Sequence, residues 1–284
     1  MKRPQEIAKD EASMATIVSL TSAFEGLASM RIAQIKNQVL ASQRFFNELW
    51  HIYTQVRVDQ LFRFGRQENE KVTDKELFIA ITAEGGFSGD IDQRLIKYML
   101  GQYDPKRQDI VIIGHHGALQ LLQAGVKYKK YFKLPEKDQN INVAPLTREV
   151  RQYRAAFVYY QTYVSLMVQD IKRIELAQAV QDAGKKAKHG DEVISELNYI
   201  FEPSSFAVAA HLEHSMLEVA LGQVILDSKL AQYASRFRAM TAAHDKSDEN
   251  LHDLHTLFNR AKRAQSDERL KEIINGLKKA GTAV

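Results

Sequence analysis

The hydrophobic positions at the amino-terminal end of the chain repeat with the period of a long α-helix. From about Ile7 to Val58 there is no proline and only one glycine, Gly26. Apolar residues recur at three- and four-residue steps, at Ile17, Leu20, Phe24 and Leu27. This spacing is typical of a helix that packs along a long helical partner, as in a coiled coil.

The carboxy-terminal end predicts that partner. Pro203 is followed by Ser204 and Ser205, either of which can cap a helix, and no proline occurs after them. The apolar stripe weakens in the middle of this helix, where Phe237 and Met240 are followed by His244 and Ser247 before it resumes at Leu251, Leu254, Phe258 and Ala261. We expect the two terminal helices to form an antiparallel pair that curves or separates at His244 and Ser247.

The middle of the chain alternates between strand and helix patterns. Leu77–Thr82 and Asp109–Gly114 are short apolar runs rich in strand-forming residues. Each precedes a glycine-containing turn and a helix-like segment, the first being Ile91–Leu100, which stops at Gly101. This order indicates a parallel α/β domain, which gives a domain division of 1–70, 71–203 and 204–284.

The remaining central segments are less regular. Val126–Leu146 is polar, carries two prolines and is expected to form a loop. Phe157–Val168 is rich in β-branched and aromatic residues and predicts a third strand, although a helix stays open for 157–180. Ala183–Asp191 reads as a turn or loop, and Glu192–Glu202 as a further strand.

Composition excludes several classes of site. The 284 residues include no cysteine, so disulfides, cysteine-based zinc sites and thiol nucleophiles are excluded. The net charge is +4, but the basic and acidic residues are interleaved, so no nucleic-acid partner is expected. The first residues lack the apolar core of a signal peptide, and no apolar run approaches the roughly 20 residues that a membrane-spanning helix needs.

Candidate chemical sites give weak signals. The loop EGGFSGD (84–90) lacks the Lys-Ser/Thr pair of a phosphate-binding loop and does not fit the dinucleotide fingerprint, so it is expected to be a tight turn. Adjacent histidines, His115 and His116, point apart and are expected at the surface. Two groups have a spacing that a metal could use, namely His211 with His214, and His244, Asp248, His252 and His255. A solvated helix face is the preferred interpretation of both, and no catalytic residue, cofactor or metal is expected.

Ordered motifs along the chain carry a resemblance to a known family. They are LTSAFEGLASMRIAQ (20–34), ITAEGGFSGDID (81–92), IVIIGHHGALQLLQAG (110–125), EPSS (202–205), ASRFRAM (234–240), FNRAKRA (258–264) and KEIING (271–276). In this order and spacing the chain resembles the gamma subunit, or central shaft, of F-type rotary ATP synthases. The resemblance implies an antiparallel coiled coil of the terminal helices and a central Rossmann-like α/β domain.

The resemblance also implies a function without bond chemistry. The chain would be the rotor stalk that couples proton- or sodium-driven rotation to conformational change in a ring of three catalytic beta and three non-catalytic alpha subunits. Further implied partners are an epsilon subunit and the membrane ion-rotor c-ring, on the cytoplasmic face of the inner membrane. The residues implied to contact partners are Phe24, Arg31, Arg236, Met240, Arg260, Lys262, Arg263, Ile273, Ile274 and Leu277.

The sequence departs from the family pattern at identifiable positions. The family turn Ser-Asp-Arg-Gly-Leu-Cys-Gly-Gly is here AEGGFSGD, which is similar to the variant sodium- or proton-coupled bacterial type. The Arg-Gln pair of the shaft motif is Lys262-Arg263, and the Met and Lys of the amino-terminal motif are Phe24 and Arg31. Two alternatives stay open: a structural or signalling scaffold built on a helical hairpin without a rotary role, and an α/β enzyme that binds a nucleotide or another small molecule at the glycine-rich loop.

Overall fold

A computed structural model describes residues 3–55, 72–136, 138, 141–186, 200, 202 and 204–281. The chain divides into two compact units. The first contains residues 1–27 and 238–284, and the second contains residues 28–237.

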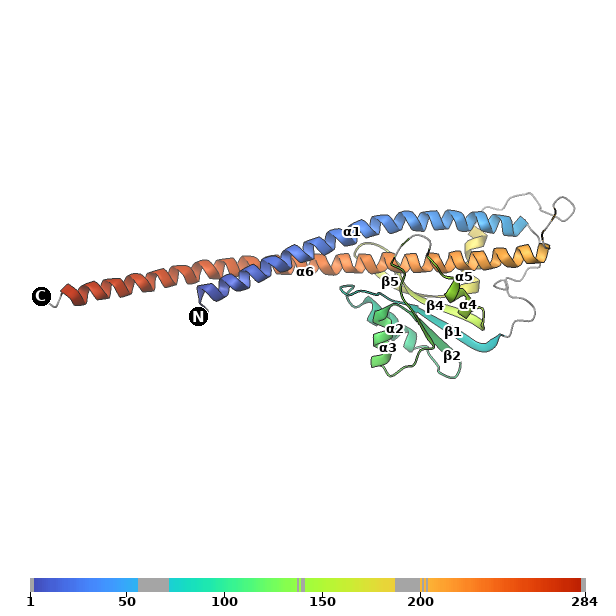
Figure 1. The fold of residues 1–284 in the computed structure, drawn as a ribbon, viewed down its shortest axis with the longest axis horizontal. Coiled ribbons are helices and arrows are strands. Elements are labelled where there is room, and N and C mark those ends of the chain that lie inside the picture. Colours follow the sequence, from blue (N-terminus) through green and yellow to red (C-terminus); the bar gives the residue numbers. More distant parts are fainter. Residues whose placement is uncertain are drawn as a thin grey trace. The chain divides into compact units, whose positions relative to one another are not determined.

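Two long helices contribute to both units. Helix α1 covers Pro4–Gln55 and helix α6 covers Ser205–Gly281 (Figure 1). The hydroxyl of Ser204 accepts a hydrogen bond of 3.2 Å from the backbone N–H of Ala207, so Ser204 is the residue that caps α6. Both predicted terminal helices are therefore confirmed, with ends within a few residues of those expected.

The second unit contains a five-stranded sheet with the order β3-β2-β1-β4-β5. The strands are β1 (Thr73–Ile81), β2 (Gln108–Ile113), β3 (Lys130–Phe132), β4 (Tyr153–Tyr163) and β5 (Gln169–Glu175). The first four strands pair in parallel, and β5 pairs antiparallel with β4. The expected parallel α/β domain is confirmed, with one antiparallel edge strand added.

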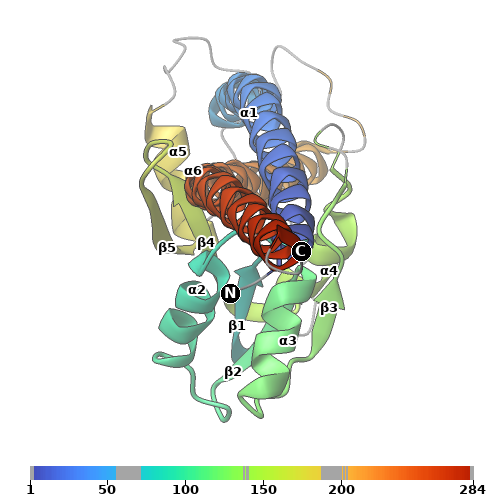
Figure 2. The same ribbon diagram turned by 90° about the vertical axis from the view of Figure 1, so that its left-hand side faces the viewer.

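Helices cover both faces of this sheet. Helices α2 (Ile91–Leu100) and α3 (His115–Gln123) pack on one face, where Phe78 and Ala80 of β1 lie in their core cluster (Figure 2). Helix α6, with α4 (Ala144–Val150) and α5 (Leu176–Lys186), packs on the other face. Alternate residues of β1 thus enter two separate cores, as strand geometry requires for a sheet buried on both sides.

Within each unit, α1 and α6 run antiparallel. In the second unit Ile32 and Ile35 of α1 share a buried cluster with Leu226 and Leu230 of α6. In the first unit the Thr241 hydroxyl donates a hydrogen bond of 2.8 Å to Glu25. Closer to the start of α1, His255 Nδ1 lies 2.8 Å from Glu11 Oε1. The order of these pairs confirms the expected antiparallel arrangement.

The weak seam predicted at His244 is closed by polar contacts. His244 Nδ1 lies 3.3 Å from the Val18 carbonyl oxygen and 3.5 Å from the Thr21 hydroxyl. Ser247 is also buried. The helices therefore do not separate at His244, because polar side chains make the contact there in place of apolar ones. That they curve at this point stays a prediction. A hollow of about 610 Å³ lies further along, lined by Ala8, Glu11, Ala12, Ala15, Asp248, Leu251, His252 and His255.

Several central segments correct the sequence-based expectations. The expected loop at 126–146 contains the edge strand β3 and the first turn of α4. Pro145 marks the start of this helix rather than a break, because proline is well accommodated in a helix's first turn. Residues 183–186, expected to be a turn, belong to α5.

The third strand is confirmed, but its boundaries differ from the expected ones. It is β4, which ends at Tyr163, and residues 164–168 turn into β5. The strand expected at 192–202 lies outside the described residues except for Ile200 and Glu202, neither of which is in a strand. No helix in the described part of the chain is both long enough and apolar enough to span a membrane.

Candidate functional site

The most connected polar site of the second unit lies where the parallel strands end. From β1 the chain continues to β2 and β3 on one side of β1, and then forms β4 on the other side of β1. The strand order therefore changes direction between β1 and β4. In open α/β sheets, ligands bind outside the carboxyl ends of the strands at such a point. The glycine-rich loop 83–90 follows β1 at this edge.

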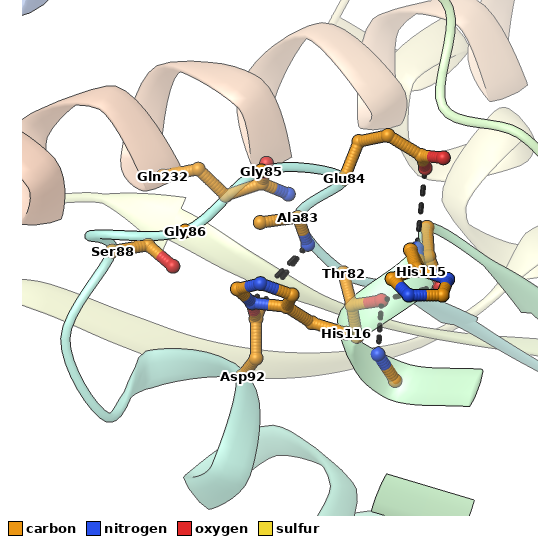
Figure 3. Close-up of polar contacts among 12 residues, drawn as sticks. Thr82, Ala83, Glu84, Gly85, Gly86, Ser88, Asp92, His115, His116 and Gln232 are labelled. Atoms are coloured by element: carbon orange, nitrogen blue, oxygen red, sulfur yellow. Dashed lines mark hydrogen bonds and ion pairs between the residues drawn. The ribbon is translucent and has the colours of Figure 1, made fainter. Parts of the chain in front are cut away.

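Asp92, in the first turn of α2, is the centre of this site and is almost fully buried. Both of its carboxylate oxygens accept from the backbone N–H of Ala83 at 3.2 Å. Its Oδ1 also accepts from Gln161 Nε2 at 2.7 Å. Its Oδ2 lies 3.1 Å from His116 Nδ1 (Figure 3). One carboxylate therefore ties together the loop, β4 and α3.

His116 is held by this carboxylate. The hydrogen bond to Asp92 raises the pKa of the His116 ring above its ordinary value, while partial burial opposes the rise. The charges of Asp92 and Glu84 act in the same direction as the hydrogen bond, and Arg236 acts against it. His115 is exposed, as expected, but the expectation that His116 is also a simple surface residue was wrong.

The network continues into helix α6. The hydroxyl of Ser228 donates a hydrogen bond of 2.5 Å to Gln161 Oε1. Ser228 in turn accepts from Gln232 Nε2 at 3.0 Å. All three side chains are buried, and the hydrogen bonds between them replace contacts with water.

Helix α6 also binds the glycine-rich loop itself. Arg236 donates to the carbonyl oxygens of Gly86 at 3.1 Å and Gly85 at 3.4 Å. The Ser235 hydroxyl donates to the carbonyl of Ser88 at 2.7 Å. The loop therefore docks against the helix through its carbonyl groups. Figure 3 shows the loop between strand β1 and helix α2, which confirms the expected strand-to-helix turn.

The amino-terminal end of α3 already has an anionic partner. Glu84 accepts hydrogen bonds from the backbone N–H of His115 at 3.1 Å and of Leu134 at 3.2 Å. Its other oxygen accepts from the Tyr131 hydroxyl at 2.8 Å. A helix N-terminus favours an anion, and here the chain supplies its own carboxylate. This arrangement gives no support to nucleotide binding at the loop.

A close backbone approach explains two glycines in this region. Gly114, between β2 and α3, has φ of 96°, and a Cβ atom there would overlap the carbonyl group of Thr82. A Cβ atom at Gly117 would lie 2.7 Å from the Thr82 hydroxyl. That hydroxyl accepts from the Gly117 N–H at 3.0 Å and donates to the Ile113 carbonyl at 2.9 Å, which holds β1 and α3 together.

A second buried polar contact lies near the same edge. Lys229 of α6 forms an ion pair with Asp138, and its Nζ also donates to the Pro135 carbonyl at 2.7 Å. Both charged side chains are less than a tenth exposed. Arg31 of α1 approaches the other carboxylate oxygen at 3.6 Å. The segment that follows β3 is therefore linked to both long helices.

The sequence-predicted contact residues occupy different environments. Arg236 lies in the loop-binding site, and Arg31 is half-exposed beside Asp138. Phe24 is 36% exposed, whereas Met240 is only 7% exposed. Arg260, Lys262 and Arg263 are exposed, as are Ile273, Ile274 and Leu277. The structure thus brings only Arg31 and Arg236 near the polar contacts described above, and the contact roles of all ten residues stay predictions.

The histidine groups do not form metal sites in the part of the chain that the structure describes. His211 is exposed, and His214 Nε2 lies 3.4 Å from Glu218. Glu213 between them is buried and accepts from the Tyr53 hydroxyl at 2.9 Å. The solvated-face interpretation therefore holds for His211, whereas Glu213 joins the two helices.

Sequence reasoning missed the central residues of the site, namely Asp92, Gln161, Ser228, Lys229 and Gln232. A usable signal was present in α6, where Ser228, Gln232 and Ser235 follow one another at helical spacing in place of apolar residues. The partners could not be found in this way, because Asp92 and Gln161 come from distant segments.

Comparisons with known proteins agree with this architecture. The model of a family described as ATP synthase matches residues 4–279. An ATP synthase gamma chain from a Geobacter species (strain M21) is 23% identical over 97% of this chain and 98% of its own length. The gamma chain of Xylella fastidiosa is 22% identical over 97% and 99% of the two chains.

Solved structures share the fold. A chain of the Euglena gracilis mitochondrial ATP synthase matches with a TM-score of 0.56 and 15% identity, covering 96% of this chain and 97% of the other. A central-stalk chain from Tetrahymena thermophila gives a TM-score of 0.55 at 15% identity, covering 79% and 99%. With the family match over nearly the whole chain, these findings show that the protein belongs to the ATP synthase gamma-chain family.

Proposed function

We propose that this chain is the central rotor-stalk subunit of an ion-transporting ATP synthase and performs no bond chemistry itself. The observation that carries the proposal is the construction of helix α6. This single helix of 77 residues is fixed to the α/β domain by Ser228, Lys229 and Arg236, and its later turns pair with α1. Its last turns expose apolar side chains in the described structure. Such a helix can carry a motion from an anchored domain to a distant partner.

Coupling by a stalk requires contacts that differ between conformations of its partners. A subunit shifts an equilibrium only as far as its contacts favour one state over another. An asymmetric pair of helices presents different side chains in each direction and can favour a different state in each subunit of a surrounding ring. The polar seam at His244 and the hollow between Ala8 and Leu251 make the helix pair of the first unit uneven along its length.

The exposed end of α6 supports a contact with the ring. Leu270, Ile273, Ile274 and Leu277 follow helical spacing, and each is at least half exposed. An exposed apolar stripe of this kind marks a surface that another protein covers. We assign it to an apolar collar of the ring, and assign Arg260, Lys262 and Arg263 to polar or acidic groups of the catalytic subunits.

The remaining partners follow from family membership. The relatives are gamma chains of ATP synthases, and matching solved structures come from such complexes. We propose an alpha and beta ring, an epsilon subunit and a membrane c-ring as partners, on the cytoplasmic face of the inner membrane. We also propose the division into an amino-terminal shaft helix (1–70), a central domain (71–203) and a carboxy-terminal shaft helix (204–284).

Native mass spectrometry of complexes recovered through a tag on this chain, at its natural expression level, tests the proposal. The expected result is one copy of the chain with three copies each of two larger subunits. A lone chain or a homodimer would contradict the stalk role and support the helical-scaffold alternative. A tagged variant with Ile273→Asp and Ile274→Asp should assemble less completely, and Leu119→Asp, on the exposed face of α3, is the matched control.

A further inference from the structure

Helix α6 carries buried polar residues where a helix on a sheet normally carries apolar ones. Its earlier contacts are apolar, through Leu217, Leu221 and Ile225. Over the following turns the buried side chains include Ser228, Lys229, Gln232 and Ser235. Ser228, Lys229 and Ser235 each bond to a different segment of the α/β domain. Gln232 bonds to Ser228. Burying such groups has a cost, so their position requires an explanation.

Directionality provides that explanation. Apolar contact is not directional, and a helix held by it alone can turn about its axis or slide with small changes in energy. Hydrogen bonds and buried ion pairs weaken steeply when the distance or angle changes. The contacts of α6 reach three separate segments: Gln161 on β4, the carbonyls of loop 83–90, and Asp138. Three fixed points around one helix define its rotation and its axial position.

We propose that this polar set is a torque-bearing joint, and that Lys229 and Asp138 are its principal positioning residues. The proposal rests on the proposed rotor-stalk function and adds the site through which rotation passes between the α/β domain and α6. Asp138 is suited to the role because its carboxylate contacts Lys229 of α6 and lies 3.6 Å from Arg31 of α1. One buried group thus meets both helices and the domain.

The joint can be separated experimentally from ordinary stability. Removing one member of a buried ion pair leaves an unpaired charge and destabilises the fold, whereas replacing both members with neutral groups of similar size is often tolerated. The double variant Lys229→Met/Asp138→Asn is therefore expected to fold with little change in thermal stability. It loses the directional contact but keeps most of the volume.

The matched control lies in the same segment. Lys133 and Glu136 form an exposed ion pair three residues apart. The double variant Lys133→Met/Glu136→Gln removes the same charges but touches neither long helix through these groups. Because the chain contains no cysteine, probes can be placed at single introduced cysteines. Exposed Lys97 on α2 and exposed His211 on α6 are suitable positions within the second unit.

The first measurement uses the complete complex. With the ring immobilised and arrested by a non-hydrolysable nucleotide, a bead on Lys97→Cys reports the angular fluctuation of the domain. We expect the Lys229→Met/Asp138→Asn variant to increase the angular variance by about two- to tenfold. The control variant should leave it unchanged. Equal variance in all three proteins, with normal rotation, would overturn the joint and leave the rotor function intact.

The second measurement uses the isolated chain and does not depend on the rotor function. Spin labels at Lys97→Cys and His211→Cys give the distribution of distances between α2 and α6. The joint predicts a broader distribution in the Lys229→Met/Asp138→Asn variant and an unchanged one in the control. An unchanged distribution in both would contradict the joint. If the distribution broadened in the Lys229→Met/Asp138→Asn variant but the chain formed no rotary complex, the mechanical contact would be supported and only the rotor function would be rejected.

Discussion

The side-chain amide of Gln161 donates a hydrogen bond of 2.7 Å to the buried carboxylate of Asp92. This contact joins strand β4 to the first turn of α2, at the edge where related folds place a ligand. The side-chain oxygen of Gln161 accepts a hydrogen bond from the Ser228 hydroxyl of α6. In this protein the edge is therefore used to attach a helix to the sheet.

The first prediction concerns Asp92. Its carboxylate accepts hydrogen bonds from Ala83, Gln161 and His116. In Asp92→Asn an amide nitrogen, itself a donor, replaces one of the two accepting oxygens. We expect the free energy of unfolding to fall by roughly 2–3 kcal/mol, because buried donors lose their acceptor. Chemical denaturation measures this change. Asp90→Asn is the control, since its side chain is exposed, and an equal effect of both variants would contradict the prediction.

The second prediction concerns pH and His116. The hydrogen bond to Asp92 raises the pKa of His116 in the folded protein. The protonated His116 ring therefore stabilises the folded protein. This stabilisation is complete below about pH 6.5, the pKa of histidine in the unfolded chain, and is lost as the pH rises through the pKa of His116 in the folded protein. The free energy of unfolding of the native protein should decrease as the pH rises from 6. The His116→Gln variant should lack the part of this decrease that comes from His116. His115→Gln should retain it, and retention in both variants would refute the assignment.

The third prediction concerns Asp227 on α6. Burial raises the pKa of its carboxyl to about 6, with Lys172 opposing the rise. Since the folded pKa exceeds the unfolded one, ionisation of this carboxyl lowers stability as the pH rises from about 4 to about 6, and the loss is constant at higher pH. Asp227→Asn should stabilise the protein at pH 7 by an amount on the order of 2 kcal/mol. Thermal unfolding should show no gain below about pH 4.

The control for this prediction is Asp245→Asn, because Asp245 is exposed in the first unit. It should leave stability unchanged at both pH values. If Asp227→Asn gave the same gain at pH 7 and below pH 4, protonation of the carboxyl would not be its cause.

The fourth prediction concerns the cationic residues near the end of α6. Lys262 and Arg263 are exposed, so their replacement by alanine should leave the folded subunit intact. We expect ATPase activity of the reconstituted complex to fall roughly fivefold or more through loss of coupling. Arg3→Ala/Lys9→Ala removes two exposed charges from the start of the chain and is the control. Unchanged activity in the Lys262→Ala/Arg263→Ala complex would reject their contact role.

The sequence predicted the elements whose signals are local. Helices α1 and α6 were recognisable because their apolar periodicity extends over many residues, and strands β1 and β2 because each is a short apolar run rich in strand-forming residues. Strand β3 was not, because it has three residues at a sheet edge and exposes two of them. Helix α4 was hidden by Pro145, whose meaning depends on whether the helix begins or ends there.

The site itself depends on contacts between distant segments. Asp92 and Gln161 are separated by 69 positions, and Lys229 and Pro135 by 94. No local pattern in either partner indicates the other. The polar residues of α6 were visible in the sequence, but their burial became evident only when β4 and loop 83–90 were placed beside them.

Direct observation of rotation shows whether this chain is the rotor stalk of its complex. The complex is immobilised through its ring, and a bead is attached to Lys97→Cys in the otherwise cysteine-free chain. On addition of ATP, the account predicts stepwise rotation in one direction, which stops when ATP is removed. An assembled and hydrolysing complex whose bead showed only random angular motion would contradict the role of this chain as the rotor stalk.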